Sequence, residues 1–210
     1  MRHGIGTKKL GVLLATAGTA CALIAPGTAS AGLLTTGAAS DCNPEISQAF
    51  APWGDSAYYR LVPGGSFESG SPSWTLSGGA KVVSGNERFD VVPGTRSLYL
   101  PSGATATSPT MCFTVGDWHA RFFARNSGNA SANLDVDILV PSLLGVVSVL
   151  DGGSVRADGT WDPSPRISAL LTNAGSLLGL TRAVSFRLKA RGTGAAFQVD
   201  DVFLDPFRCR

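Results

Sequence analysis

The sequence is poor in charge, in histidine and in catalytic motifs, and each shortage excludes a class of function. Charged residues make up 15% of its 210 residues, and the two histidines are His3 and His119. No G-x-S-x-G, H-E-x-x-H or phosphate-loop pattern occurs. A histidine-rich metal site is therefore excluded, and a Ser/His/Asp triad would have to use His119. We expect no enzymatic activity, with a secreted glycoside or ester hydrolase as the less favoured alternative.

The formal net charge of +2 belongs to the first 31 residues. Lysine and arginine number 17 and aspartate and glutamate 15, but Arg2, Lys8 and Lys9 lie in a segment without acidic residues. The rest of the chain is almost neutral, so it has no overall attraction for a polyanion. Nucleic acid is therefore not an expected partner, whereas neutral glycans and extracellular proteins are.

Long hydrophobic runs are absent except near the N-terminus. Residues 10–24 are apolar apart from glycine and threonine, and they precede Ala29-Ser30-Ala31, whose small side chains suit a cleavage site. With the basic residues in front, this is the layout of a secretory signal peptide. The run is shorter than the ~20 residues that span a bilayer. We expect residues 1–31 to be removed and the remainder to be a secreted monomer without a membrane segment.

Cysteine is scarce, and removal of the signal peptide leaves an odd number. Cys21 is lost with the signal peptide, and Cys42, Cys112 and Cys209 remain. Two of the three should pair in an oxidising exterior, which leaves one thiol or an intermolecular bridge. Cys42 and Cys209 lie near opposite ends of the domain, and the chain ends of compact domains are often neighbours. Cys112, in the strand-like run 111–115, is the competing partner of Cys42, and both pairings stay open.

Glycine and proline are abundant, at 26 and 12 residues, and they separate short β-type runs. This spacing predicts an all-β fold, an antiparallel β-sandwich with at most one short helix, at residues 167–178. We assign residues 32–57 to a partly disordered N-terminal extension and residues 58–207 to the sandwich. The candidate strands are residues 58–62, 66–67, 80–83, 97–100, 111–115, 118–125, 133–140, 145–150, 184–190 and 197–204.

Three of these runs, 118–125, 133–140 and 184–190, alternate between apolar and polar residues, which places each set on its own face. If the loop 126–132 closes symmetrically, the first two runs form a hairpin with Phe122 opposite Val136. All three runs then share one outer face. That face carries His119, Arg121, Phe123, Arg125, Asp135, Asp137, Arg187 and Lys189.

Two segments near the ends of the sandwich carry a family resemblance. Residues 63–70, Pro-Gly-Gly-Ser-Phe-Glu-Ser-Gly, are followed by Trp74 and resemble the opening N-x-G-F-E-x-G … W strand of carbohydrate-binding modules with the galactose-binding-like jelly roll. Residues 197–205 are similar to the closing F-x-I-D-D-V-x-L strand of those modules. The resemblance implies a jelly roll that binds an extracellular or cell-wall glycan. Residues 42–55 depart from it and look more like small secreted bacterial proteins of undefined function on the same fold.

The resemblance also implies a structural calcium ion. In such modules, a glutamate of the opening strand and an aspartate of the closing strand supply oxygen ligands, as this hard cation prefers. The matching residues are Glu68 and either Asp200 or Asp201. The alternative is that Glu68 caps a turn and that the two aspartates are solvated groups at a strand end.

Sugar binding usually needs aromatic rings that stack on the sugar, together with polar groups that fix its orientation. Trp53 and Trp161 lie in loops rich in proline and glycine, where exposure is plausible, and Tyr58 and Tyr59 alternate, so that one of them points outward. We take Trp53, Trp161 and Tyr58 as candidate stacking rings. Trp74 and Trp118 are assigned to the core.

The charged outer face has two interpretations. It is either a ladder of cross-strand ion pairs or a glycan-binding face with Arg121, Phe123, Asp135 and Arg187 as contacts. The sequence therefore favours a secreted, non-catalytic, carbohydrate-binding-like protein. The alternative is a cell-surface structural or protein-interaction domain that uses the jelly roll only as a scaffold.

Overall fold

The computed structural model describes residues 45–69, 73–113, 117–141, 147–169 and 182–206, apart from the side chains of residues 117, 118, 182 and 206. All of these belong to one compact unit, Leu34–Arg210. None of the helices within the described residues is long and apolar enough to cross a membrane. The predicted signal peptide lies outside the described residues.

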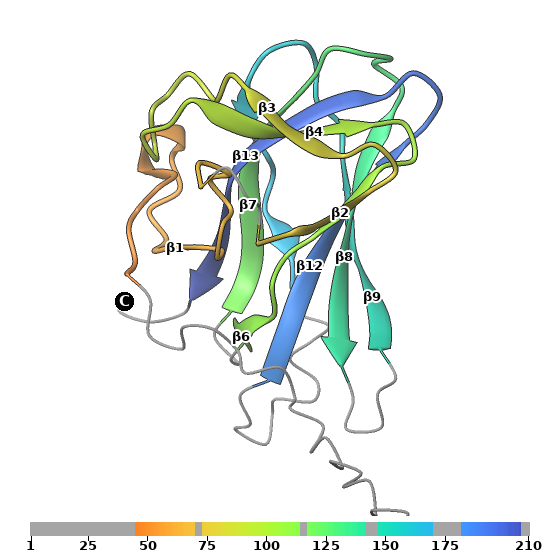
Figure 1. Cartoon of the computed structure of the whole chain (residues 1–210). Helices are drawn as coiled ribbons and strands as arrows, with labels where there is room; N and C mark the ends of the chain where they lie inside the picture. The colour runs from red at the N-terminus through yellow and green to blue at the C-terminus, as the bar shows by residue number, and fades with distance from the viewer. Residues whose placement is uncertain (1–44, 70–72, 114–116, 142–146, 170–181, 207–210) are drawn as a thin grey trace, which may run out of the picture. The chain divides into compact units, whose positions relative to one another are not determined.

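Two antiparallel sheets form the molecule (Figure 1). The seven-stranded sheet has the order β10-β7-β13-β4-β3, with β1 added to β13 and β11 added to β7. Its strands are β1 (Arg60–Leu61), β3 (Lys81–Ser84), β4 (Arg96–Pro101), β7 (Asp117–Asn126), β10 (Asp162–Pro163), β11 (Ile167–Ser168) and β13 (Ala196–Pro206).

The six-stranded sheet has the order β2-β5-β12-β8-β9, with β6 added to β12. Its strands are β2 (Thr75–Ser77), β5 (Thr105–Thr107), β6 (Met111–Phe113), β8 (Asn133–Pro141), β9 (Val147–Val155) and β12 (Arg182–Arg191). A short 3-10 helix, η1 (Ala51–Trp53), precedes the strands.

Successive strands change sheet, which gives the fold its jelly-roll topology. The chain passes from β4 to β5, from β7 to β8 and from β12 to β13 between the two sheets. As a result, β13 lies between β4 and β7 in one sheet, while β12 lies between β5 and β8 in the other. The sequence-based prediction of an antiparallel jelly-roll sandwich is confirmed.

The main core fills the space between the sheets, and the alternation read from the sequence supplies it. On β8 and β12, every second residue is buried and the residues between are half-buried or exposed. This follows from the two-residue period of side chains along a strand. The inward residues include Ala120, Phe122, Ala124, Leu134, Val136, Ile138, Val184, Phe186 and Leu188, all less than 3% exposed.

The predicted hairpin is wrong, although the faces of its strands were assigned correctly. β7 pairs with β13, β10 and β11, whereas β8 pairs with β12 and β9. Phe122 and Val136 both belong to the main core, but they come from opposite sheets. A two-residue period fixes which side chains share a face and leaves open which strand lies alongside. The single charged outer face is therefore divided between two faces that point away from each other.

A second apolar cluster covers the outer face of the seven-stranded sheet. Phe123 and Phe203 point outward from this sheet, yet they are buried in one cluster with Phe50 of the N-terminal extension and with Tyr59 just after it. The ring centroids of Phe50 and Phe123 are 5.3 Å apart and those of Phe50 and Phe203 are 5.6 Å apart. We call residues 47–59 the covering segment; its two ends are joined by the bridge between Ser47 and Tyr59.

Two further sequence-based predictions fall partly outside the described residues. Ile167 and Ser168, at the start of the helix candidate, form β11, and residues 170–178 are not described. Cys112 is buried and disulfide-bonded. Cys42 and Cys209 lie outside the described residues, so the choice of pairing stays a prediction.

Because the covering segment is held mainly by buried rings, we expect Phe50→Ala to lower the free energy of unfolding by about 3–5 kcal/mol. Tyr58→Ala is the matched control, because Tyr58 lies in the same segment and is 37% exposed; its cost should be below about 1 kcal/mol. Denaturant unfolding of both variants measures the difference. Equal costs for the two variants would contradict a buried role for Phe50.

Candidate functional site

No described segment packs over the outer face of the six-stranded sheet, which is polar over β2, β5, β12 and the first half of β8. We call it the open face. Its outward side chains on four strands are half-buried or exposed, whereas Arg121 and Phe123 on the corresponding face of the other sheet are buried. The open face carries Thr75 and Ser77 of β2, Thr105 and Thr107 of β5, Ser185, Arg187, Lys189 and Arg191 of β12, and Asn133, Asp135 and Asp137 of β8.

Ion pairs join β12 to β8 across this face. Arg187 lies opposite Asp137 in the register, and its Nε is 2.9 Å from Oδ2 of the carboxylate. Arg191 reaches diagonally to Asp135, which lies opposite Lys189. Cross-strand ion pairs are thus present on this face, as predicted for one of its two interpretations, and the described ones join β12 to β8.

Further polar groups lie beside these ion pairs. Lys189 forms no ion pair with any residue that the structure describes. Ser77 and Thr105, next to it across β5, share a hydroxyl contact of 2.6 Å. The open face therefore presents hydroxyl, ammonium, guanidinium and carboxylate groups in register, which can exchange hydrogen bonds with a polyhydroxylated ligand.

The predicted contacts Arg121 and Phe123 are wrong as surface groups, because the covering segment buries both. Arg121 is 8% exposed and Phe123 is fully buried. The Arg121 guanidinium lies 4.2 Å from the Phe50 ring centroid and donates to the Ser164 carbonyl and to Asp55. Three groups of the protein itself hold it, and its burial keeps it from contacting a ligand at the surface.

Asp55 is the acceptor that ties the covering segment to the sheet. Its Oδ2 lies 2.8 Å from Nη1 of Arg121, 2.9 Å from Nε of Arg166 and 2.8 Å from the Tyr59 hydroxyl. Burial by itself would raise the pKa of Asp55, but the bonds from Arg166, Tyr59 and Arg121 outweigh it and hold that pKa well below its usual range. Burial, followed by the hydrogen bond to Asp55, raises the pKa of Tyr59.

The three candidate stacking rings differ in exposure. Trp161 is 6% exposed and lies under the Arg125 guanidinium, 5.2 Å from its ring centroid. Trp53 is half-buried and packs edge-on against Phe89 and Phe123. Tyr58 is 37% exposed. The expectation that both loop tryptophans are exposed is therefore wrong, since each is used to close the second apolar cluster.

The calcium candidates are used as acceptors for the loop between β3 and β4. Glu68 Oε1 accepts from the backbone N–H groups of Thr95 and Arg96 at 2.8 and 2.7 Å. Asp200 Oδ2 accepts from Glu87, and Asp201 Oδ2 accepts from Val92. No group of three or more His, Cys, Asp or Glu side chains that could hold a metal occurs in the described ranges. The turn-capping alternative for Glu68 is thus present, and calcium binding stays a prediction.

Burial and the repulsion of neighbouring carboxylates raise the pKa values of Asp200 and Asp201. Burial, followed by the charge of Asp201, raises the pKa of Asp200 to about 8. Burial and the charges of Glu87, Glu68 and Asp90 raise that of Asp201 to about 7. Asp201 also has a left-handed backbone, with φ of 46°. An arrangement of this kind favours the neutral acid, or a bound cation, over bare carboxylates.

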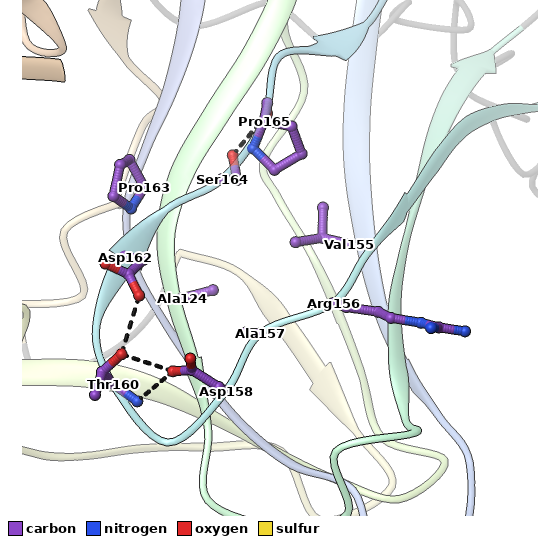
Figure 2. Close-up of a pocket in the computed structure, with 10 residues that line it drawn as sticks. All are labelled: Ala124, Val155, Arg156, Ala157, Asp158, Thr160, Asp162, Pro163, Ser164 and Pro165. Atoms are coloured by element: carbon purple, nitrogen blue, oxygen red, sulfur yellow. Dashed lines mark hydrogen bonds between the residues drawn. The ribbon is translucent and has the colours of Figure 1, made fainter.

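A small cavity of about 130 Å³ lies beside β10, against Ala124 of β7 (Figure 2). At its rim, the Thr160 hydroxyl is 2.6 Å from Asp158 and 3.0 Å from Asp162. Hydrogen bonds from Thr160 lower the pKa of Asp158. Both carboxylates hold the turn, and the cavity is well below the roughly 300–1,000 Å³ of ligand pockets. We assign no ligand to it.

His119 contacts a carboxylate but no nucleophile. Its Nδ1 is 3.4 Å from Oδ2 of Asp205, and Ser168 lies opposite it in the β11–β7 register. No hydrogen bond joins Ser168 to His119 in the described part of the chain. The nucleophile–base contact that a hydrolytic triad requires is therefore missing from this arrangement.

No protein-family model matches the chain, and no curated protein matches it. Some of the solved structures that it resembles are carbohydrate-binding modules. The CBM22-1 xylan-binding domain from Paenibacillus barcinonensis is 15% identical with a TM-score of 0.47, over 69% of this chain and 93% of that one. A CBM61 module in complex with β-1,4-galactotriose is 17% identical with a TM-score of 0.46, over 70% of this chain and 97% of that one.

A third structure is the family 11 module of a Clostridium thermocellum cellulosomal cellulase, at 17% identity and a TM-score of 0.41, over 70% of this chain and 94% of that one. At these identities the likeness concerns the fold alone. It assigns no role to any residue of this chain.

Sequence reasoning missed the residues that decide which face is covered. Asp55, Arg166 and Phe50 were not candidates, although Asp55 lies in the segment that departs from the family pattern. One signal was available: Phe123 is a large apolar residue among the outward positions of its strand, and such a residue usually has something packed over it.

We expect the melting temperature, measured with a chelator present, to fall as the pH rises from about 4 to about 8. The folded-state pKa values of Asp200 and Asp201 lie above the ordinary 3.8, at about 8 and 7. The folded state therefore binds more protons in this range, and stability is lost as these groups ionise. The Asp55 shift has the opposite sign, but it acts only below about pH 4.

Asp201→Asn tests this cause. The amide oxygen can keep the bond from Val92 and the residue type tolerates a left-handed backbone, so only the charge is removed. The variant should match the wild type near pH 4 and melt higher at pH 8, by a few degrees for each ~1 kcal/mol gained. Asp137→Asn, on the open face, is the control. Parallel pH profiles for wild type and Asp201→Asn would contradict the assignment.

Proposed function

We propose that the chain is a secreted, non-catalytic glycan-binding protein and that the glycan lies across the open face. The observation that carries the proposal is that one sheet is covered by a segment with its own apolar cluster, while the other keeps a polar outer face in register over four strands. The sequence resemblance to carbohydrate-binding modules supports the same conclusion.

The charges of the open face favour a neutral glycan. Arg187 and Arg191 are matched by Asp137 and Asp135, so neither sign dominates. A carboxylate and a guanidinium side by side accept from and donate to adjacent hydroxyls of one sugar. A polyanion would instead need unpaired cations, of which Lys189 is one within the described residues. Binding should therefore depend only weakly on salt.

One observation favours the second candidate, a protein-interaction domain. None of the outward residues that define the open face is aromatic, and Trp161 and Trp53 are packed against the other sheet. Sugar binding without a stacked ring relies on hydrogen bonds, so we expect modest affinity for glycans.

Pull-down on insoluble polysaccharides and a glycan array test the first proposal. The double variant Asp137→Asn with Arg187→Gln keeps a polar side chain at both positions and removes both charges. It should weaken binding by roughly tenfold or more, since hydrogen bonds to charged groups are worth about 1.5–3 kcal/mol each. Lys81→Gln is the control, because Lys81 is an exposed cation on the other sheet. Absence of binding to every glycan would overturn the proposal and favour the interaction domain.

We also propose that calcium binds at Glu68 and Asp201. The repulsion that raises the pKa of Asp201 is the supporting observation; a divalent cation would relieve it, with further oxygens needed to reach the usual six to eight ligands. At pH 8, calcium should raise the melting temperature of the wild type by several degrees but not that of Asp201→Asn. If the wild type melts at the same temperature with calcium as with chelator, calcium binding at this site is contradicted.

A further inference from the structure

The four sheet edges differ in how well they are protected against pairing with another strand. The seven-stranded sheet ends in β10 and β11, of two residues each, and in β3, which has four residues and begins with Lys81. The six-stranded sheet ends on one side in β2 and β6, of three residues each. Short strands, lysine and proline are the usual means of blocking edge-to-edge association.

The fourth edge, β9, has none of these protections. It is nine residues long, and its first four residues, Val147–Leu150, are uncharged. Val147 and Val149 are 50% and 51% exposed, although valine is an apolar residue of high β propensity. A long, exposed, apolar edge strand is a ready template for another strand.

Within the described residues, the backbone of this edge is hydrogen-bonded to a neighbouring strand on one side only. β9 pairs with β8 alone, and no backbone hydrogen bond links Val147–Asp151 to another segment within the described residues. In an antiparallel ladder, the groups that do not face the partner strand point outward in the sheet plane. The regular stretch ends at a register shift next to Gly152 and Gly153, the latter with φ of 113°. The open template is therefore Val147–Asp151.

We propose that β9 is a homodimer interface, in which two copies pair antiparallel through Val147–Asp151 about a two-fold axis. Antiparallel pairing suits a second copy because the same strand serves on both sides and the interface closes. In this register the Val149 side chains of the two copies lie opposite each other, where an apolar cross-strand pair is stabilising, and Val147 of each copy lies opposite Asp151 of the other.

Charge supports this occupant. The template carries one charged residue, Asp151, at its end. Antiparallel pairing sends the two Asp151 carboxylates to opposite ends of the interface, so no like charges meet.

The proposed dimer differs from the monomer expected from the sequence. The two six-stranded sheets become one continuous sheet, and this inference stands whether or not the open face binds a glycan.

Sedimentation velocity of the protein without its signal peptide, over a wide range of concentration, tests the proposal. The wild type should shift from monomer to dimer mass as concentration rises. Val149→Lys places a charge at the centre of the interface and should weaken dimerisation by at least about tenfold. Ser77→Lys is the matched control, since it adds the same charge to the exposed edge strand β2 of the same sheet; it should dimerise like the wild type.

Two further measurements distinguish dimerisation through β9 from other forms of association. The dimer must dissociate on a denaturing gel without reductant, because a covalent dimer would come from the odd cysteine. The amides of Val147–Asp151 should exchange hydrogen more slowly at high than at low concentration. A wild type that is monomeric throughout, a covalent dimer, or a Val149→Lys variant that dimerises unchanged would each overturn the proposal.

Discussion

The contact between Asp55 and two arginines fixes which half of this sandwich is available to a partner. A buried carboxylate is costly unless its charge and its hydrogen bonds are matched, and Arg121, Arg166 and Tyr59 do both. Because Arg121 belongs to the sheet and Asp55 to the covering segment, neither can be satisfied unless the segment is in place. Once the covering segment is in place, the aromatic rings around Phe50 are buried.

The two outer faces of the sandwich are therefore chemically different. One is closed by aromatic side chains, with Trp53 and Trp161 at its margin, and the other keeps its hydroxyls and ion pairs at the surface. Arginines that look equivalent along the sequence have opposite roles as a result. Arg121 is part of the interior, whereas Arg187 remains half-exposed beside Asp137.

How far the sequence could predict this structure depends on the range of each interaction. Alternation along a strand is local, so the inward residues of β7, β8 and β12 could be assigned from the sequence. The sheet to which each strand belongs is not local. β7 and β8 follow each other in the chain with a turn between them, which is typical of a hairpin, yet they lie in different sheets.

The candidate site was predictable to the same extent. Asp135, Asp137 and Arg187 were expected to share a face because they alternate with apolar residues, and the structure places all three on the open face. The burial of Trp161 could not be foreseen, since it depends on Arg125 of β7 stacking over its ring. Nor could the role of Asp55, whose partners Arg121 and Arg166 are 66 and 111 residues away along the chain.

The position of β13 has a consequence for the order in which the chain can fold. It is the last of the described strands, yet it pairs with β1, β4 and β7 and so joins parts of the sheet that do not pair with one another. While the chain is being synthesised, these parts have no common partner before Ala196–Pro206 has emerged. The seven-stranded sheet must therefore stay open until this last described strand has been synthesised.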